Sequence, residues 1–145
     1  MRVLLKELLR GDRFDLELEG VSTAGFVSCS GLESSREVLE YREGGSDRVE
    51  FFEDGPSTGR LVLERGLTRD AELWNWYQDA LPRSGAVVLL DEDGKESMRW
   101  SFHSALAVSW KGPPLDARDP EIALEKLEIV YEGLRWKKNL SLIHI

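Results

Sequence analysis

The sequence predicts a mainly β domain, a small β-barrel or sandwich flanked by one helix. Three observations predict this class: apolar and polar residues alternate in several short segments, turn residues separate these segments, and one stretch has clear helical periodicity. With 145 residues, 41% hydrophobic content and five tryptophans, the chain can bury one core and needs no second domain. We therefore expect a single domain over residues 1–138.

The first strands follow from period-two alternation and from glycines. Apolar and acidic residues alternate over 14–18, and Gly20 ends that segment. Small, mixed residues over 24–32 predict a second, irregular strand. A further strand is predicted over 61–64 and is closed by Gly66.

A long protruding hairpin is predicted over residues 36–53. Two β-rich pieces, 38–41 and 49–52, flank the turn residues 44–47, whose glycines adopt turn conformations at low steric cost. The second arm ends in the turn signal 53–56. We expect a hairpin whose tip stands away from the domain.

One helix is predicted from about residue 69 to residue 80. Thr68 is the expected N-cap, Asp70 and Glu72 lie where they favour the positive end of the helix dipole, and Pro82 prevents further extension. Its apolar stripe consists of Leu73, Trp76, Tyr77, Ala80 and Leu81. The stripe covers about a third of the helix circumference, which predicts packing across a sheet.

The second half of the chain predicts a long strand pair. An apolar run over 86–90 precedes the Asp93-Gly94 pair, which favours a two-residue hairpin loop. Even positions over 98–110 are then mostly apolar, with a break or bulge expected at Ser104 and Ala105. Residues 119–133 fit two structures. Asp119 as N-cap, Pro120 at the first helical position and Gly133 at the end favour a helix, whereas apolar and polar residues in the second half alternate as in a strand.

Residues that carry chemistry are scarce. His103 and His144 are the only histidines and Cys29 is the only cysteine, so no pair has metal-ligand spacing. The acidic turn 91–94 lacks the later ligands of a calcium loop, and the surroundings of Ser30 do not match a nucleophile elbow. We predict no catalytic residue, no cofactor and no metal.

Charge and composition exclude other classes. The formal net charge of -8, from 19 basic and 27 acidic residues, argues against a nucleic-acid-binding surface and against sequence-specific DNA recognition. Lys6, Glu7 and Arg10 interrupt the N-terminal leucines too early for a signal peptide or a membrane span, so no membrane insertion is expected. A single cysteine fits synthesis in a reducing cytoplasm.

A series of motifs in fixed order runs from residue 24 to residue 134: AGFVSCSGLES, LEYREGG, RLVLERGLT, ELWNWYQDAL, GAVVLLDEDGKE, MRWSFHSALAVSWKGPPLDA and EIALEKLEIVYEGL. The hairpin at 41–45, the RGLT step into a tryptophan helix and the WKGPPLDA turn are together the most specific. In this order the sequence resembles the tail tube proteins of contractile phages and of related extracellular contractile injection systems.

The resemblance implies a structural subunit without catalysis. Hexameric rings would stack into a hollow tube that conducts DNA or protein cargo, and closing the barrel would need a strand at 119–133. Implied partners are other copies of the chain, a contractile sheath protein, baseplate hub and tape-measure proteins, and cargo in the lumen. We expect synthesis in the bacterial cytoplasm and assembly into a phage tail or injection particle.

In the resembled family the long hairpin reaches the next ring. The ring-stacking residues implied here are Tyr41, Arg42, Glu43, Gly44, Gly45, Val49, Phe51 and Phe52. Two other functions stay open: a single-ring tube initiator, baseplate or terminator relative, and a monomeric ligand-binding β-barrel module.

Two segments depart from the expected pattern. The stretch FFEDGPSTG is acidic, which bears on the charge of the ring-stacking contact, and the excess of acidic residues suggests an acidic lumen that repels cargo. Residues 139–145 match nothing expected of the family and are interpreted as a non-native or disordered tail, with a terminal strand as the alternative.

Overall fold

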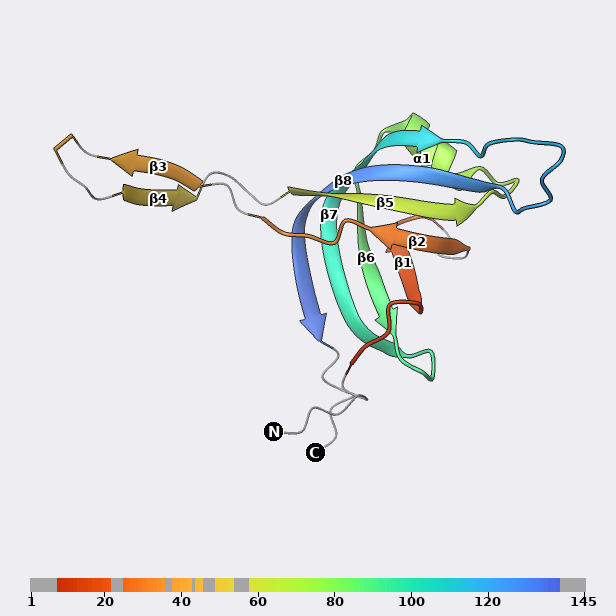
Figure 1. Ribbon diagram of the computed structural model, residues 1–145, viewed down its shortest axis with the longest axis horizontal. Coiled ribbons are helices and arrows are strands. Elements are labelled where there is room, and N and C mark those ends of the chain that lie inside the picture. Colours follow the sequence, from red (N-terminus) through yellow and green to blue (C-terminus); the bar gives the residue numbers. More distant parts are fainter. Residues whose placement is uncertain are drawn as a thin grey trace.

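In its described residues, the computed structural model of the chain contains one six-stranded antiparallel sheet, one helix and a separate two-stranded hairpin (Figure 1). The structure describes residues 8–21, 25–35, 38–42, 44–45, 49–53 and 58–138. The elements are β1 Phe14–Leu18, β2 Phe26–Ser30, β3 Val38–Arg42, β4 Val49–Glu53, β5 Thr58–Gly66, α1 Glu72–Asp79, β6 Arg83–Leu90, β7 Glu96–Lys111 and β8 Leu124–Lys138. The predicted fold class, mainly β with a flanking helix and a protruding hairpin, is confirmed.

The large sheet has the strand order β1-β6-β7-β8-β5-β2. Strands β1 and β2 are consecutive in the sequence and lie at opposite edges of the sheet, which curls so that both edges border one cavity (Figure 1). The residues buried deepest in the core are Leu16, Leu61, Leu63, Leu73, Trp76, Leu127 and Ile129. A sheet curled around its own apolar side chains encloses a core without a second sheet.

Strand β8 resolves the segment that fitted two structures. Asp119 does accept a hydrogen bond from the Glu121 amide at 3.1 Å, as a helix cap would, but no helix follows. Strand β8 begins instead at Leu124. This strand pairs with β5 on one side and with β7 on the other. The predicted strand is confirmed from Leu124 onward, and its alternate residues Leu127 and Ile129 are both fully buried in the core.

A bulge in β7 reverses which side chains face the core. Ser104 has a φ of 53°, and the register with β8 shifts between His103 and Leu106. Phe102 is buried before the bulge, whereas Ala105 is buried after it. The expected irregularity is confirmed, and the extra residue flips the alternation, so that even positions face the core before the bulge and odd positions face it afterwards.

The helix begins later than predicted. Ala71 adopts a left-handed conformation with a φ of 54°, so α1 starts at Glu72. The Asp70 carboxylate accepts the Glu72 amide at 3.1 Å and the Thr68 hydroxyl at 2.6 Å, and Thr68 is therefore not the cap. At the other end Leu81 is 58% exposed and lies outside the buried stripe.

Within the described residues no helix is long and apolar enough to cross a bilayer.

The turn between β6 and β7 also differs from the prediction. The Asp91 amide donates to the Lys95 carbonyl at 2.8 Å, and Gly94 has a φ of 78°. Asp91 further accepts the amides of Asp93 and Lys95 through Oδ1, each at 2.9 Å. The antiparallel pairing is confirmed, but the loop is longer than two residues because the Asp91 carboxylate organises it.

Candidate assembly surfaces

The hairpin stands away from the domain on the side of β8 (Figure 1). Strands β3 and β4 pair antiparallel with each other and form a sheet of their own. The structure places Tyr41 and Arg42 on β3, Gly44 and Gly45 in the turn, and Val49, Phe51 and Phe52 on β4. Glu43 lies outside the described residues, as does the tail 139–145. The hairpin geometry agrees with the prediction, and its contacts with a partner stay a prediction.

Besides β2, the described sheet has two stretches of strand with an unpaired side, β1 and the C-terminal part of β8. Strand β1 pairs with β6, and no described strand pairs with its other edge. The described pairing of β5 with β8 ends at Glu132, so among the described residues the last part of β8, residues 133–138, has β7 on one side and no strand on the other. Open edges expose backbone donors and acceptors that another strand can pair with.

These two edges carry opposite charges on the same face of the sheet. One row of paired residues crosses the strands β1, β6, β7 and β8 in turn. It consists of Glu17, Ala86, Ser101 and Arg135, with Glu17 at one end and Arg135 at the other. The next row of that face runs from Asp15 through Val88 and Arg99 to Lys137, and both end residues are exposed. We call this the polar face. The β1 edge of the polar face is therefore acidic, and the β8 edge is basic.

The opposite side, here called the apolar face, is continuous between the same two edges. Leu16 pairs across to Val87, Val87 to Trp100, and Trp100 to Trp136. The two indole rings stack with their centroids 5.9 Å apart. Leu16 is fully buried, whereas Trp136 is 62% exposed at the open edge. An exposed tryptophan at an unpaired edge is typical of a contact surface.

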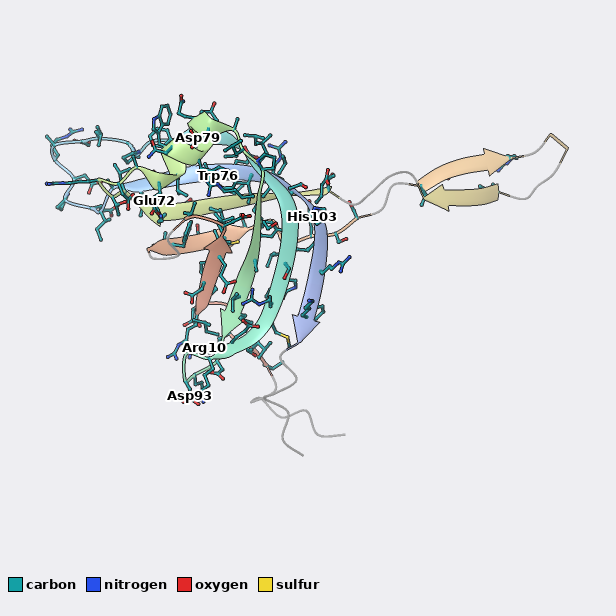
Figure 2. The ribbon with its side chains drawn as sticks, turned by 180° about the vertical axis from the view of Figure 1, so that it is seen from behind. Arg10, Glu72, Trp76, Asp79, Asp93 and His103 are labelled. Atoms are coloured by element: carbon teal, nitrogen blue, oxygen red, sulfur yellow. The ribbon has the colours of Figure 1, made fainter. Side chains whose placement is uncertain are left out.

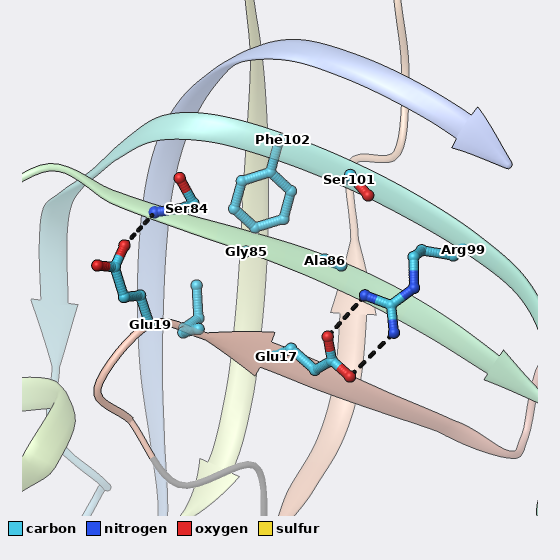
Figure 3. Close-up of a pocket in the computed structure, with 9 residues that line it drawn as sticks. Glu17, Glu19, Ser84, Gly85, Ala86, Arg99, Ser101 and Phe102 are labelled. Carbon is cyan, nitrogen blue, oxygen red and sulfur yellow. Dashed lines mark hydrogen bonds and ion pairs between the residues drawn. The ribbon is translucent and has the colours of Figure 1, made fainter.

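A shallow cavity of about 500 Å³ lies on the polar face between β1 and β7 (Figure 3). The Arg99 guanidinium donates to both carboxylate oxygens of Glu17, at 2.6 and 3.0 Å, and to Glu96 at 2.6 Å. The bonds from Arg99 hold the pKa of Glu96 below its ordinary value, and the two carboxylates raise the pKa of Arg99. This guanidinium is a cross-link between strands rather than a free anion receptor.

A buried ion pair, which the sequence analysis missed, fixes the helix to the sheet. Arg65 and Glu125 are 2% and 1% exposed, and Arg65 Nη2 lies 3.4 Å from Glu125 Oε1. Arg65 Nη1 also donates to Glu72 at 3.2 Å, and the Trp110 indole donates to Glu125 at 3.0 Å. The sequence pattern could have indicated this pair, because both charged residues occupy inward positions of strands with alternating burial, β5 and β8. Pairing and hydrogen bonding make such burial tolerable.

Among the described residues, no group of three or more His, Cys, Asp and Glu side chains is placed to hold a metal ion. What the structure does offer is two open edges of opposite charge, an exposed aromatic side chain beside one of them, and a hairpin that stands clear of the domain. These features define the class of self-assembling structural subunits.

Comparison with known proteins places the chain in a family. The family model of the T4-like virus tail tube protein gp19 matches residues 11–135. The chain therefore belongs to the family of T4-like virus tail tube proteins. A search of curated proteins gave no match.

Solved structures share the fold. A chain of the extended sheath-tube complex of an extracellular contractile injection system, PVC, has a TM-score of 0.76 and 22% identity, over 92% of this chain and 94% of that chain. A chain of the anti-feeding prophage tube-terminating cap has a TM-score of 0.79 and 20% identity, over 95% and 96%. A chain of the anti-feeding prophage baseplate has a TM-score of 0.72 and 24% identity, over 90% and 96%.

Proposed function

We propose that the chain is the structural subunit of the inner tube of a contractile injection machine. The match of the tail tube family to residues 11–135 carries this proposal. Copies associate into hexameric rings, and the rings stack into a hollow tube that conducts DNA or protein cargo. The chain catalyses no reaction and acts through its contacts.

The ring closes through the two open edges of the sheet. Strands β1, β6, β7 and β8 alternate in direction, so the end of β8 meets β1 of the next copy in antiparallel orientation. Arg135 and Lys137 of one copy then lie on the same face as Asp15 of the next. Pairing of this kind is heterologous, and it closes into a ring when the rotation between copies allows it.

The hairpin makes the contact between stacked rings. Strands β3 and β4 carry the predicted stacking residues Tyr41, Arg42, Val49, Phe51 and Phe52, with Gly44 and Gly45 at the turn and Glu43 between. A head-to-tail contact between rings does not close, so it produces a filament.

The remaining partners follow from the assembly. Two of the solved relatives are chains of a sheath-tube complex and of a baseplate, which supports a contractile sheath protein and baseplate hub proteins as partners of this chain. Tape-measure protein and cargo would occupy the lumen. The subunit is made in the bacterial cytoplasm and assembles into a phage tail or injection particle, with residues 1–138 as its single domain.

In the closed ring the polar face lines the lumen, because the core and α1 cover the apolar face of the sheet. Along this face the described residues carry both signs, with Glu17 paired to Arg99 and Asp15 in the same row as Lys137. A lumen of alternating charge binds neither acidic nor basic cargo strongly. This mixed lumen differs from the acidic lumen expected from composition, and mapping the charge of an assembled ring decides between the two.

A second candidate function is a single-ring relative at the end of a tube. The resemblance to a chain of a tube-terminating cap, with a TM-score of 0.79, favours it. Such a subunit would use the same open edges to close a ring but would not stack copies of itself.

Negative-stain electron microscopy of the purified chain tests both functions. Tubes or stacked rings support the inner tube, and single rings support the cap or baseplate role. Monomers that persist at high protein concentration and low ionic strength would contradict both assignments and favour a monomeric module.

A further inference from the structure

The two chain segments that join the hairpin to the domain converge on one side chain, Tyr131 of β8. Residues 31–35 follow β2 and lead toward β3, and we call them the outgoing root. Residues 58–60 are the start of β5, which follows β4, and we call them the return root. Tyr131 is 2% exposed, so its ring is part of the core.

Tyr131 contacts both roots. Its hydroxyl donates to two carbonyl oxygens of the outgoing root, those of Gly31 and Glu33, each at 3.1 Å. The return root passes directly against the same side chain, because a Cβ at Gly59 would clash with the Tyr131 ring and hydroxyl. The two roots also touch each other, since a Cβ at Gly31 would clash with the Arg60 carbonyl oxygen.

The sheet itself does not hold the outgoing root. The described pairing of β2 with β5 ends at Ser30, which lies opposite Val62. Beyond Ser30 the carbonyl oxygens of Gly31 and Glu33 accept instead from the buried hydroxyl of Tyr131. A buried donor needs an acceptor, so this hydroxyl keeps the outgoing root close to the domain.

We propose that Tyr131 is a positioning residue whose hydroxyl fixes the direction in which the hairpin leaves the domain, so that the free subunit is ready to assemble. This inference rests on the proposed tube function, and it concerns a contact within one subunit.

The geometry of the hairpin makes its direction sensitive to the roots. In Figures 1 and 2 the hairpin stands clear of the domain on the side where β5 begins. Each arm has five residues and spans roughly 17 Å. A tilt of about 10° at the roots would move the far end of such an arm by about 3 Å, which breaks close packing at an interface. A direction fixed before assembly also lowers the entropy lost on binding.

Tyr131→Phe tests the hydroxyl, because it removes this group and keeps the ring, whose centroid lies 5.2 Å from that of Phe102. Tyr77→Phe is the matched control, since Tyr77 packs against the same core but lies on α1. We expect the protein concentration at which rings or tubes first form to rise about fivefold for Tyr131→Phe. It should stay unchanged for Tyr77→Phe. Sedimentation and negative-stain microscopy of unlabelled chains measure this concentration.

Spin labels measure the direction of the hairpin separately from stability. In a Cys29→Ser background, Val38→Cys on β3 and Val108→Cys on β7 carry the labels, since both positions are partly exposed. Double electron–electron resonance of the unassembled subunit gives the distribution of distances between them. We expect this distribution to be at least about twofold wider with Tyr131→Phe and unchanged with Tyr77→Phe. A loss of core stability alone would lower the melting temperature and leave this width unchanged.

A second pair of variants addresses the acceptor side of the contact and leaves the core untouched. The Glu33 side chain is exposed, and Glu33→Gly frees the backbone that presents one of the two carbonyl oxygens. Glu33→Ala is its control. We expect Glu33→Gly, but not Glu33→Ala, to widen the distance distribution and to weaken assembly. If Tyr131→Phe does not fold, this pair decides the question alone.

The outcomes separate this inference from the proposed function. Wider distributions together with weaker assembly, confined to Tyr131→Phe and Glu33→Gly, support the inference. Folded variants with an unchanged distribution, or with a wider distribution and unchanged assembly, would overturn it and leave the tube function intact. An unsubstituted chain that forms neither rings nor tubes contradicts the tube function itself, and with it the link from Tyr131 to assembly.

Discussion

At the scale of single residues, the buried pair of Arg65 and Glu125 joins three elements. Arg65 projects from β5, Glu125 projects from β8, and Glu72 at the start of α1 contacts the same guanidinium. The Arg65 guanidinium also lies over the Phe26 ring of β2, 5.4 Å from its centroid. A charge so enclosed has no access to water, so its partners determine whether the site is stable.

We expect Glu125→Gln to lower the free energy of unfolding by about 3 kcal/mol, because it leaves a buried guanidinium without its buried carboxylate. Urea denaturation followed by tryptophan fluorescence measures the loss. The matched control is Glu128→Gln, whose contact with Arg60 lies at the surface and should cost less than about 1 kcal/mol. Equal losses in the two variants would show that the buried pair contributes no more than an exposed one.

Two glycines with positive φ differ in their surroundings. Gly94 has a φ of 78° and open space around it, whereas Gly31 has a φ of 104° and a Cβ there would lie 2.0 Å from the Arg60 carbonyl oxygen. We expect Gly94→Ala to cost about 1 kcal/mol of stability from backbone strain alone. Gly31→Ala should cost roughly 3 kcal/mol, because backbone must move as well. Thermal unfolding of both variants measures this, and a Gly31 variant as stable as the Gly94 variant would contradict the close approach.

At the scale of elements, α1 packs against the sheet through one of its faces, which carries Leu73 and Trp76. Trp76 is 1% exposed and its indole donates to the Leu81 carbonyl at 2.8 Å, whereas Trp74 on the same helix is 39% exposed. Burial of Trp76 and Leu73 anchors the helix to the sheet. Helices of this length gain most of their stability from such packing.

Trp76→Ala should destabilise the protein by about 3–5 kcal/mol through the cavity it leaves. Trp74→Ala removes the same side chain from the same helix and should cost about 1 kcal/mol, because much of that ring is already in water. Circular dichroism during urea denaturation gives both values. If Trp74→Ala proved the more damaging change, the assignment of the buried face of α1 would be wrong.

At the scale of the whole molecule, the charges on the two sheet edges should control ring closure. Asp15→Lys places a cation on the acidic edge, opposite the basic edge of the next copy, and should reduce assembly at low salt. Combining it with Lys137→Asp reverses both edges and should restore rings, since the charges are again complementary. Sedimentation and negative-stain microscopy of the two variants measure assembly. Unchanged assembly of the single variant, or failure of the charge swap to restore any, would argue against this edge contact.

A half-buried thiol, Cys29, and a buried phenol, Tyr131, make the fold sensitive to alkali. Burial raises the pKa of the Cys29 thiol from 9.0 to about 11, and burial also raises the pKa of Tyr131. Both groups are neutral in the native state, so their contribution is complete below about pH 9 and falls as the pH rises toward and beyond 11. We expect the melting temperature to fall above pH 9, and Cys29→Ser to fall less steeply. Identical pH profiles for the two proteins would exclude the thiol as a cause.

Much of the fold could be predicted from local patterns. Alternation located β1 and β5 and allowed a strand in the first half of β8, and glycines located the end of β1 and the hairpin turn. These features are local, because the two faces of a strand and the conformational freedom of glycine depend on neighbours in the sequence. The hairpin residues of the candidate site were placed correctly on their strands for the same reason.

Where local signals competed, distant contacts decided. Ala71, not Thr68, stands at the N-cap of α1, with the Asp70 carboxylate accepting the Glu72 amide, and the bulge at Ser104 redirects the second half of β7. Arg65 and Glu125, separated by 60 residues, were recognisable as charges at inward positions but not as partners.

The sequence by itself determined a mainly β subunit with one helix, a protruding hairpin and few groups suited to chemistry. Only the tertiary structure decided that, among the described residues, β1 and the end of β8 have unpaired sides of opposite charge, and that β1 and β2 border one largely apolar cavity. Strand order joins segments far apart in the chain, and the free energy that selects it comes from long-range pairing and burial, which no local pattern encodes.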